Sequence, residues 1–399
     1  MARLPMAVGL AWMALLSSAC GAEADAGPAA DAEPRAGDPE QVGPFAVGVT
    51  TLEAPDPAGD RPLPLTVWYP ARAPAGAAPA EYQLEIGVLV LATLESPLGA
   101  VREAPLDERG APYPVVVFSH GNGGLAIQSL YLTEHLASHG FVVVSPDHVG
   151  NTFETQVNQS LALPAAEVAK LRPLDVTRSL DALFEASAGA GTVLSGSADV
   201  ERVGAAGHSF GGYTTLRVAG GLADPQGFTD LCAGGDGGLL CDGWEPGFQL
   251  PALARDPRVR AALPQAPGGA AAFAPGGFAA ITIPTMIQAG STDEVTPAAA
   301  EAEAPYAELG GPAWLVVVED AGHFTFSNMC LLVDMLGLTI EDFDDGCGDA
   351  NVDAAIAHRL INRYATAFFQ HTIAGRGDFA ALLTPGAAPP AGLTRFDAR

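Results

Sequence analysis

Short apolar runs recur along the chain and alternate with longer segments in which apolar positions have helical spacing. The runs that read as strands are 65–69, 115–118, 141–144, 203–207, 259–263, 285–289 and 314–318. The segments that read as helices are 127–139, 176–186, 210–220, 298–309 and 352–371. Continuous apolar runs are typical of strands buried on both faces. The alternation therefore predicts an α/β fold with a mostly parallel, doubly wound sheet and helices on both faces.

The first strand and the long connections add detail to this prediction. Leu65–Tyr69 alternates in polarity and stops at Pro70, which favours an antiparallel strand at the sheet edge. Loops at the carboxyl ends of parallel strands carry the chemistry in such folds. The long connections 151–174, 222–257 and 324–351 follow predicted strands, so we expect them to form a cap over that edge.

The N-terminus has the pattern of an export signal. A short basic start precedes an apolar stretch at 6–18, which is too short to span a bilayer. It ends in Leu16-Ser17-Ser18-Ala19-Cys20, which resembles a bacterial lipobox. We expect a signal peptide at 1–19 and lipid on Cys20, with simple cleavage after Ala19 as the alternative. Both interpretations place the protein outside the cytoplasm, facing the periplasm or the cell exterior.

The segment 20–43 consists largely of Ala, Pro, Gly and acidic residues. Such a composition buries little apolar surface, so it predicts a disordered tether. We expect one catalytic domain over 44–380 and a C-terminal tail at 381–399.

The charge balance excludes one class of partner. The chain carries 19 Lys+Arg against 46 Asp+Glu, a net charge of −27, and Lys170 is its one lysine. Nucleic-acid binding requires basic patches, which this composition does not supply. An anionic membrane surface would also repel the chain. Membrane attachment would therefore depend on lipid at Cys20.

The remaining cysteines, Cys232, Cys241, Cys330 and Cys347, are even in number, as expected of an exported protein with disulfides. Neighbours in sequence suggest the pairs Cys232–Cys241 and Cys330–Cys347, although three connectivities are formally possible. No Cys-x-x-Cys spacing supports a zinc site.

The most specific motif is Gly207-His208-Ser209-Phe210-Gly211, placed between a predicted strand and a predicted helix. A tight strand-to-helix turn of this kind exposes a serine hydroxyl, and the flanking glycines allow close approach of neighbouring backbone. Ser209 is therefore the candidate nucleophile.

A serine nucleophile needs a base and an orienting carboxylate. Asp293 and His323 follow the strands 285–289 and 314–318 and come after the serine in the required order, with Asp as orienter and His as base. The amides of Phe210 and of Asn122, in the glycine-rich loop 120–124, are the candidate oxyanion donors. His120 is expected to support that loop.

Three segments together, 115–124, 136–148 and 207–212, resemble secreted platelet-activating factor acetylhydrolases and bacterial dienelactone-hydrolase-like proteins. The resemblance implies an α/β-hydrolase fold, a triad of Ser209, Asp293 and His323, and an oxyanion hole at Phe210 and Asn122. Ser209 stands where true dienelactone hydrolases have cysteine, and Asn122 where the acetylhydrolases usually have an apolar residue.

We therefore expect a serine esterase that cleaves short-acyl or lipid-like carboxylic esters through an acyl-enzyme, without metal or organic cofactor. The substrate would be a small-molecule or lipid ester. A polyester or lipid hydrolase, an amidase, and a non-catalytic binding protein of the same fold are the alternatives. The acidic run 341–349 lacks the alternating ligand spacing of a calcium loop and is expected to be a solvated loop.

Overall fold

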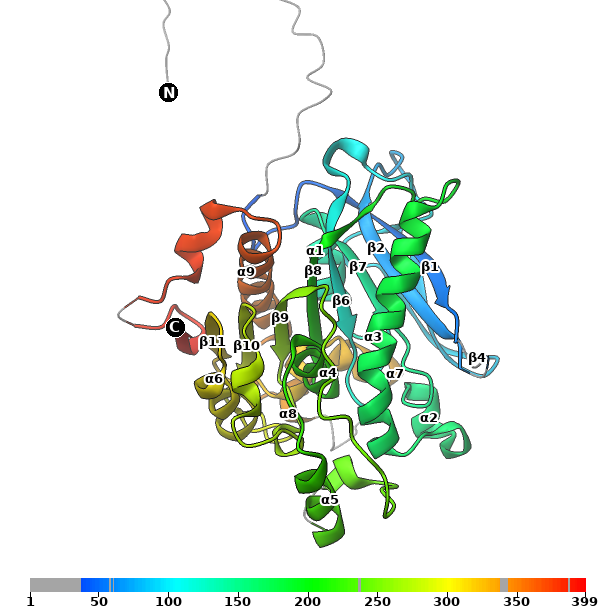
Figure 1. The fold of residues 1–399 in the computed structure, drawn as a ribbon. Helices are drawn as coiled ribbons and strands as arrows, with labels where there is room; N and C mark the ends of the chain where they lie inside the picture. Colours follow the sequence, from blue (N-terminus) through cyan, green and yellow to red (C-terminus); the bar gives the residue numbers. More distant parts are fainter. Residues whose placement is uncertain (1–36, 57–58, 60, 236–237, 338–343, 387) are drawn as a thin grey trace, which may run out of the picture. The chain divides into compact units, whose positions relative to one another are not determined.

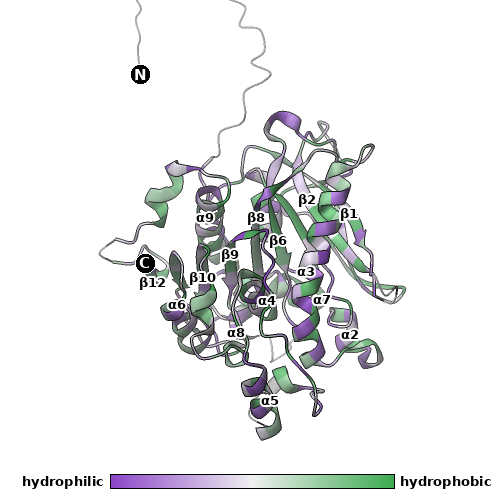
Figure 2. Cartoon of the chain, viewed as in Figure 1, coloured by the Kyte–Doolittle hydropathy of each residue, from purple (hydrophilic) through white to green (hydrophobic). Residues whose placement is uncertain are grey.

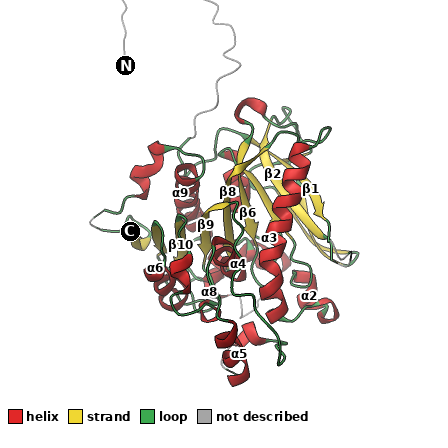
Figure 3. Cartoon of the chain, in the orientation of Figure 1, coloured by secondary structure: helices red, strands yellow, loops and turns green. Residues whose placement is uncertain are grey.

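The three-dimensional structure, a computed structural model, describes residues 37–56, 59, 61–235, 238–337, 344–386 and 388–399. The expected signal peptide, Cys20 and most of the expected tether lie outside the described residues. Within the described part, strands and helices alternate along most of the chain (Figure 3).

Ten described strands form one sheet in the order β12-β11-β10-β9-β8-β6-β7-β2-β1-β5 (Figure 1). Their bounds are β1 (Ala46–Ala54), β2 (Leu63–Ala71), β5 (Val101–Arg102), β6 (Tyr113–Ser119), β7 (Val142–Pro146), β8 (Ala198–His208), β9 (Val259–Gln265), β10 (Thr285–Gly290), β11 (Ala313–Val318) and β12 (Leu393–Ala398). The strands from β7 to β11 pair in parallel, while β2 and β12 pair antiparallel with β7 and β11. A separate hairpin joins β3 (Glu81–Ile86) to β4 (Leu89–Glu95).

The helices cover both faces of the large sheet. Their bounds are α1 (Leu130–Ser138), α2 (Phe153–Val157), α3 (Ala165–Ala188), α4 (Phe210–Ala219), α5 (Pro225–Gly234), α6 (Ala304–Glu308), α7 (Met329–Leu336), α8 (Asp344–Cys347) and α9 (Ala354–Thr372). Short 3-10 turns include η1 (Glu108–Gly110), η2 (Gln159–Leu161), η3 (Gly238–Cys241), η4 (Ala270–Ala272), η5 (Gly277–Ala280), η7 (His323–Phe326) and η9 (Gly377–Leu383), and a π-helical turn η6 spans Ala299–Glu303.

Strand β6 shows how the sequence divides between the two faces. Val116 and Phe118 pack in one apolar cluster with residues of α1 and α9. Val115 and Val117 pack in another with residues of α3. Because successive side chains of a strand point to opposite faces, an uninterrupted apolar run is needed where both faces are covered. The apolar colour of the central strands follows from this burial (Figure 2).

The doubly wound α/β sheet expected from the sequence is confirmed, with differences at its edges. β2 is not an edge strand, because β1 and β5 extend the sheet beyond it. The expected tail 381–399 instead contributes β12, whose Leu393 and Phe396 are buried. Part of the expected tether is held as well, since the carbonyl oxygens of Pro39 and Gln41 accept hydrogen bonds from His135 and His139.

Two helices also differ from the prediction. α3 begins at Ala165 and continues through Pro173, so it is longer than the predicted 176–186. The predicted helix 298–309 is divided into the π-helical turn η6 and the short helix α6. Apolar spacing locates the buried middle of a helix better than its ends.

Both expected disulfides, Cys232–Cys241 and Cys330–Cys347, are present. Disulfides persist in oxidising compartments, so they indicate an exported protein. Among the helices of the described part, none is long and apolar enough to cross a membrane.

Several histidines are buried in this fold. Burial lowers the pKa of His135 to about 3, with the neighbouring His139 adding to the effect, and that of His148 to about 4, with Arg172 adding to it. Burial also holds the pKa values of His120 and His208 well below the ordinary value. These side chains are therefore neutral in the folded protein at neutral pH.

We predict that acid destabilises the fold from about pH 6.5 downward, where unfolded histidines begin to bind protons that the folded ones exclude. His135 and His148 would each cost about 2 kcal/mol at about pH 5. Burial raises the pKa of Asp147 to about 6 and also raises the pKa values of Glu134 and Glu301, so these carboxyls act in the opposite direction. The buried histidines with lowered pKa values outnumber them. Thermal unfolding measured at constant ionic strength should show Tm falling through this range. A Tm that stays constant between about pH 7.5 and 5 would contradict the prediction.

Candidate active site

The candidate residues lie at the carboxyl ends of neighbouring parallel strands. Asn122 follows β6, Ser209 follows β8, Asp293 follows β10 and His323 follows β11. In the sheet these strands are adjacent or separated by one strand, β9, between β8 and β10. The fold therefore gathers at one edge the side chains that the sequence separates widely.

Ser209 occupies a strained turn between β8 and α4. Its φ of 58° and ψ of −119° are unusual for a residue with a side chain and cost about 1–3 kcal/mol. The turn is held because the Ser209 amide donates to the Gln265 carbonyl (2.9 Å) and its carbonyl accepts from Gly268 N (3.2 Å). A Cβ on Gly211 would lie 1.8 Å from the Ser119 carbonyl oxygen, so this position requires glycine.

Asp293 and His323 form a buried pair. His323 Nδ1 lies 3.0 Å from Asp293 Oδ2, and both side chains are almost fully buried. Thr296 supports the carboxylate, donating its amide to Oδ1 (2.6 Å) and its hydroxyl to Oδ2 (2.8 Å). With Nδ1–H directed at Asp293, His323 Nε2 carries the lone pair that a general base needs. The described residues include no direct hydrogen bond between Ser209 and His323.

Ser209 and the candidate oxyanion residues line one pocket of about 300 Å³. Its walls are Asn122, Ala165, Ser209, Phe210, Leu240, Gly268, Gly269, Val295, Thr296 and Glu301. Phe210 is the first residue of α4, so no carbonyl within the helix accepts from its amide. Ala165 and Leu240 come from two of the long connections that were expected to cap the site.

Two comparisons with known proteins agree with this arrangement. A chlorophyllase family model matches residues 94–232, which include Asn122, Ser209 and Phe210. A ferulic acid esterase from Streptomyces cinnamoneus is similar in structure, with a TM-score of 0.59 and 21% sequence identity over 89% of this chain and 96% of that chain. The chain has the α/β-hydrolase fold.

In this fold a buried relay of hydrogen bonds connects the loops of the candidate site. Gln128 Oε1 accepts from the Gly121 amide (2.9 Å), and Gln128 Nε2 lies 2.8 Å from His208 Nδ1. His208 Nε2 in turn lies 3.0 Å from the His323 carbonyl oxygen. Burial, and then the neighbouring His323, hold the pKa of His208 well below its usual range. A neutral His208 can accept at Nδ1 and donate at Nε2, so it joins the glycine-rich loop 120–124, here called the candidate oxyanion loop, to the loop that carries His323.

Arg172 of α3 supports the candidate oxyanion loop from the buried side. Its fully buried guanidinium donates to the carbonyls of His120 (2.5 Å) and Gly121 (2.8 Å) and to Asn151 Oδ1 (2.8 Å). It also lies 4.8 Å from the Phe210 ring. With these carbonyls held inward, one side chain contacts both segments that carry the candidate oxyanion amides.

A second chain of Ser, His and Asp lies beneath this loop. Ser119 Oγ is 2.9 Å from His148 Nε2, and His148 Nδ1 is 2.9 Å from Asp175 Oδ2. Burial alone would raise the pKa of Asp175, but hydrogen bonds from Arg61 and His148 outweigh it and the pKa is lowered. Ser119 is 1% exposed, so substrate cannot reach it and the chain is structural.

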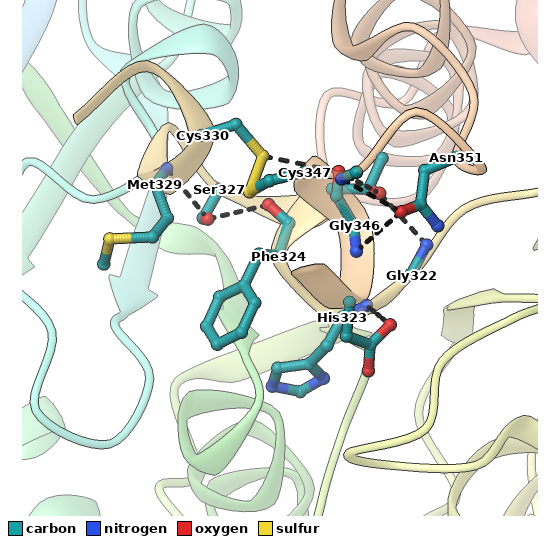
Figure 4. Close-up of a disulfide and its surroundings, with 12 residues drawn as sticks. Gly322, His323, Phe324, Ser327, Met329, Cys330, Gly346, Cys347 and Asn351 are labelled. Carbon is teal, nitrogen blue, oxygen red and sulfur yellow. Dashed lines mark hydrogen bonds between the residues drawn. A yellow bond between two sulfur atoms is a disulfide. The ribbon is translucent and has the colours of Figure 1, made fainter. Parts of the chain in front are cut away.

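Asp345 braces both parts of the Asp293–His323 pair. Its Oδ1 accepts from the His323 amide (2.9 Å), and its Oδ2 accepts from the amides of Glu294 (2.8 Å) and Val295 (3.0 Å). The disulfide Cys330–Cys347 closes the segment that carries it, next to the His323 loop (Figure 4). The acidic run at 341–349 was expected to be solvated. That expectation was wrong for Asp345, which is half-buried, while 341–343 lie outside the described residues.

These supporting residues were not identified from the sequence. His208 lies within the serine motif, but its neighbours in sequence give no indication of a bond to His323. Gln128, Arg172 and Asp345 act through partners distant along the chain, so no local pattern marks them. Only Arg172 had a signal in the sequence, because it lies at helical spacing from apolar residues that form the buried face of α3.

We predict that Asp345→Asn lowers kcat about tenfold and leaves KM within about twofold. The asparagine amide cannot accept all the hydrogen bonds that the Asp345 carboxylate accepts, so the Asp293–His323 pair would shift slightly from its working position. Steady-state kinetics on a chromogenic ester measures both constants. The matched control is Asp349→Asn, an exposed aspartate of the same segment. Equal kcat values in both variants would show that Asp345 does not position the pair.

Proposed function

We propose that the protein is a serine hydrolase that cleaves carboxylic esters through an acyl-enzyme. The observation that carries the proposal is the strained Ser209 in a pocket that Phe210, Asn122 and Thr296 also line. The Thr296 hydroxyl lies within hydrogen-bond distance of both Asp293 and His323, which pair with each other. The similarity to an esterase, by its name, and to a chlorophyllase family model supports ester chemistry.

In the proposed mechanism His323 Nε2 removes the proton from Ser209 as Oγ attacks the ester carbonyl. Asp293 stabilises the imidazolium that forms. The amides of Phe210 and Asn122 donate to the oxyanion, and each such donor contributes about 2.7–4 kcal/mol to the transition state. Collapse breaks the ester C–O bond, and His323 gives its proton to the leaving alcohol. Water, deprotonated by His323, then releases the acid and restores Ser209.

Two neighbouring pockets support a proposal about the parts of the substrate. Beside the pocket of about 300 Å³ lies a second of about 110 Å³, and Asn122 and Ala165 line both. The second is lined mainly by polar side chains, including Asn151, Gln156 and Asp242. We therefore propose an ester with a compact apolar part for the first pocket and a polar part for the second. Preference for short-acyl or lipid-like esters belongs to this proposal.

We predict that Ser209→Ala lowers kcat for p-nitrophenyl esters by about 10⁴-fold, because the variant lacks the hydroxyl that forms the proposed acyl-enzyme. The wild-type rates across increasing acyl length should peak and then fall as the acyl chain outgrows the pocket. Ser195→Ala, distant from the pocket in a turn before β8, is the matched control.

A fluorophosphonate reagent with mass spectrometry checks the covalent step independently. Labelling of Ser209 is expected in the wild type and the control and is lost in Ser209→Ala. Equal hydrolysis by the wild type and Ser209→Ala would refute the mechanism.

We further propose that the exported chain is anchored through lipid on Cys20, which follows the apolar signal. The net charge of −27 supports a lipid anchor rather than electrostatic attachment to an anionic bilayer. Growth of an expressing bacterium with an alkyne-labelled fatty acid should label the wild type, and Cys20→Ser should abolish the label. A mature protein that begins at Cys20 without lipid would contradict the anchor and leave export intact.

A further inference from the structure

Glu301 is the one side chain with a formal charge among the residues that line the candidate substrate pocket. Most of the other walls are apolar side chains or glycine backbone, and no lysine, arginine or histidine belongs to the lining. A carboxylate in such a place costs solvation free energy and requires compensation. Its position is therefore informative about what binds there.

The protein itself compensates this carboxylate only in part. Glu301 is half-buried, and Oε2 accepts a hydrogen bond from the Ala270 amide (2.8 Å). Among the residues that the structure describes, no cationic group forms an ion pair with it, and the other oxygen, Oε1, accepts no hydrogen bond. Burial raises the pKa of Glu301, and the charge of Asp293 raises it further. One oxygen is thus left for a ligand.

The next acidic residue on the same turn shows the contrast. Glu303, also in η6, forms an ion pair with Arg395, and both side chains are more than one-third exposed. π-helical turns are rare and occur often at functional sites, because the extra residue changes the direction of the following side chains. One carboxylate of this turn is therefore paired with a cation at the surface and the other lines the pocket without a cationic partner.

We propose that Glu301 determines specificity by accepting a hydrogen bond from a hydroxyl group on the part of the ester that occupies this pocket. The same carboxylate would exclude a substrate that carries its own carboxylate there, because two like charges would be desolvated together. The inference rests on the proposed ester hydrolase activity. It names the substrate class as esters whose apolar portion ends in a hydroxyl group.

The experiment compares esters that differ only at the end of one chain. Methyl esters of linear acids would carry a methyl, hydroxyl, carboxylate or trimethylammonium end over a range of chain lengths. A second series tests the possibility that the alcohol part of the ester occupies the pocket. It compares acetates of alkanols, which end in a methyl, with monoacetates of the corresponding α,ω-diols, which end in a hydroxyl. Hydrolysis is followed by pH-stat titration, and kcat/KM is compared at the best chain length of each series.

The wild type should prefer the hydroxyl over the methyl end and discriminate against the carboxylate end. Glu301→Leu should reduce the hydroxyl-to-methyl ratio of kcat/KM by about tenfold or more, since the acceptor is lost. Glu301→Gln keeps an acceptor and its bond to Ala270, so it should retain much of this ratio while losing discrimination against the carboxylate. Glu308→Gln, exposed on the adjoining helix α6, is the matched control and should keep the wild-type ratios.

Unchanged ratios in both Glu301 variants, with Ser209 still labelled and esters still hydrolysed, would overturn the subsite and leave the hydrolase standing. A preference for trimethylammonium over hydroxyl that Glu301→Gln removes would overturn the hydroxyl assignment, because the pocket would then recognise positive charge. If the wild type neither hydrolyses these esters nor reacts at Ser209, the proposed function fails and the subsite fails with it.

Discussion

The close approach of helix α4 to strand β6 is the constraint on which the candidate site depends. The backbone at Gly211 touches the Ser119 carbonyl, and that at Gly212 touches Pro267, with room for no side chain at either place. This contact brings the start of α4 against the end of the sheet and holds Ser209 at positive φ. It also places the first amide of the helix beside the serine and brings Gly268 and Gly269 into the pocket wall. The candidate nucleophile, a candidate amide donor and a pocket wall all depend on this one steric condition.

The polar groups beneath the site solve a second problem, which is to keep loops rigid without exposing them to water. Burying the carbonyls of the candidate oxyanion loop without hydrogen-bond donors would cost free energy. The Arg172 guanidinium supplies the donors for two of these carbonyls. The relay through Gln128 and His208 uses neutral groups, so it adds directional bonds without adding buried charge. Arg172 does bring a buried charge beneath the site, and burial lowers its pKa to about 9 while the nearby Asp175 acts in the opposite direction. Asp175 itself also pairs with Arg61 and Arg178. Rigidity at the site thus comes from neutral hydrogen bonds together with one compensated charge cluster.

The sequence predicts the central strands and the residues at their ends because both depend on local signals. The apolar run of β6 and the glycine spacing around Ser209 can both be recognised from the sequence alone. β1 and β12 were not predicted because both contain polar as well as apolar residues. They become recognisable as strands only through contacts with distant segments, such as the packing of Leu393 and Phe396 in the apolar core. Asp345 was misinterpreted for the same reason, since its partners lie at His323 and Glu294 rather than beside it. What depends on contacts between distant segments cannot be read from periodicity.

The disulfide Cys330–Cys347 affects when the candidate site is assembled as well as how it is held. The segment that it closes carries the carboxylate that holds both the His323 and the Asp293 turns. In a reducing compartment the two thiols would remain apart, and this carboxylate would be attached to a longer, unrestrained loop. The last step in assembling the Asp293–His323 pair would then take place where cysteines oxidise, after the chain has left the cytoplasm. The proposed hydrolase, completed in this order, would spare the esters of the cell that makes it.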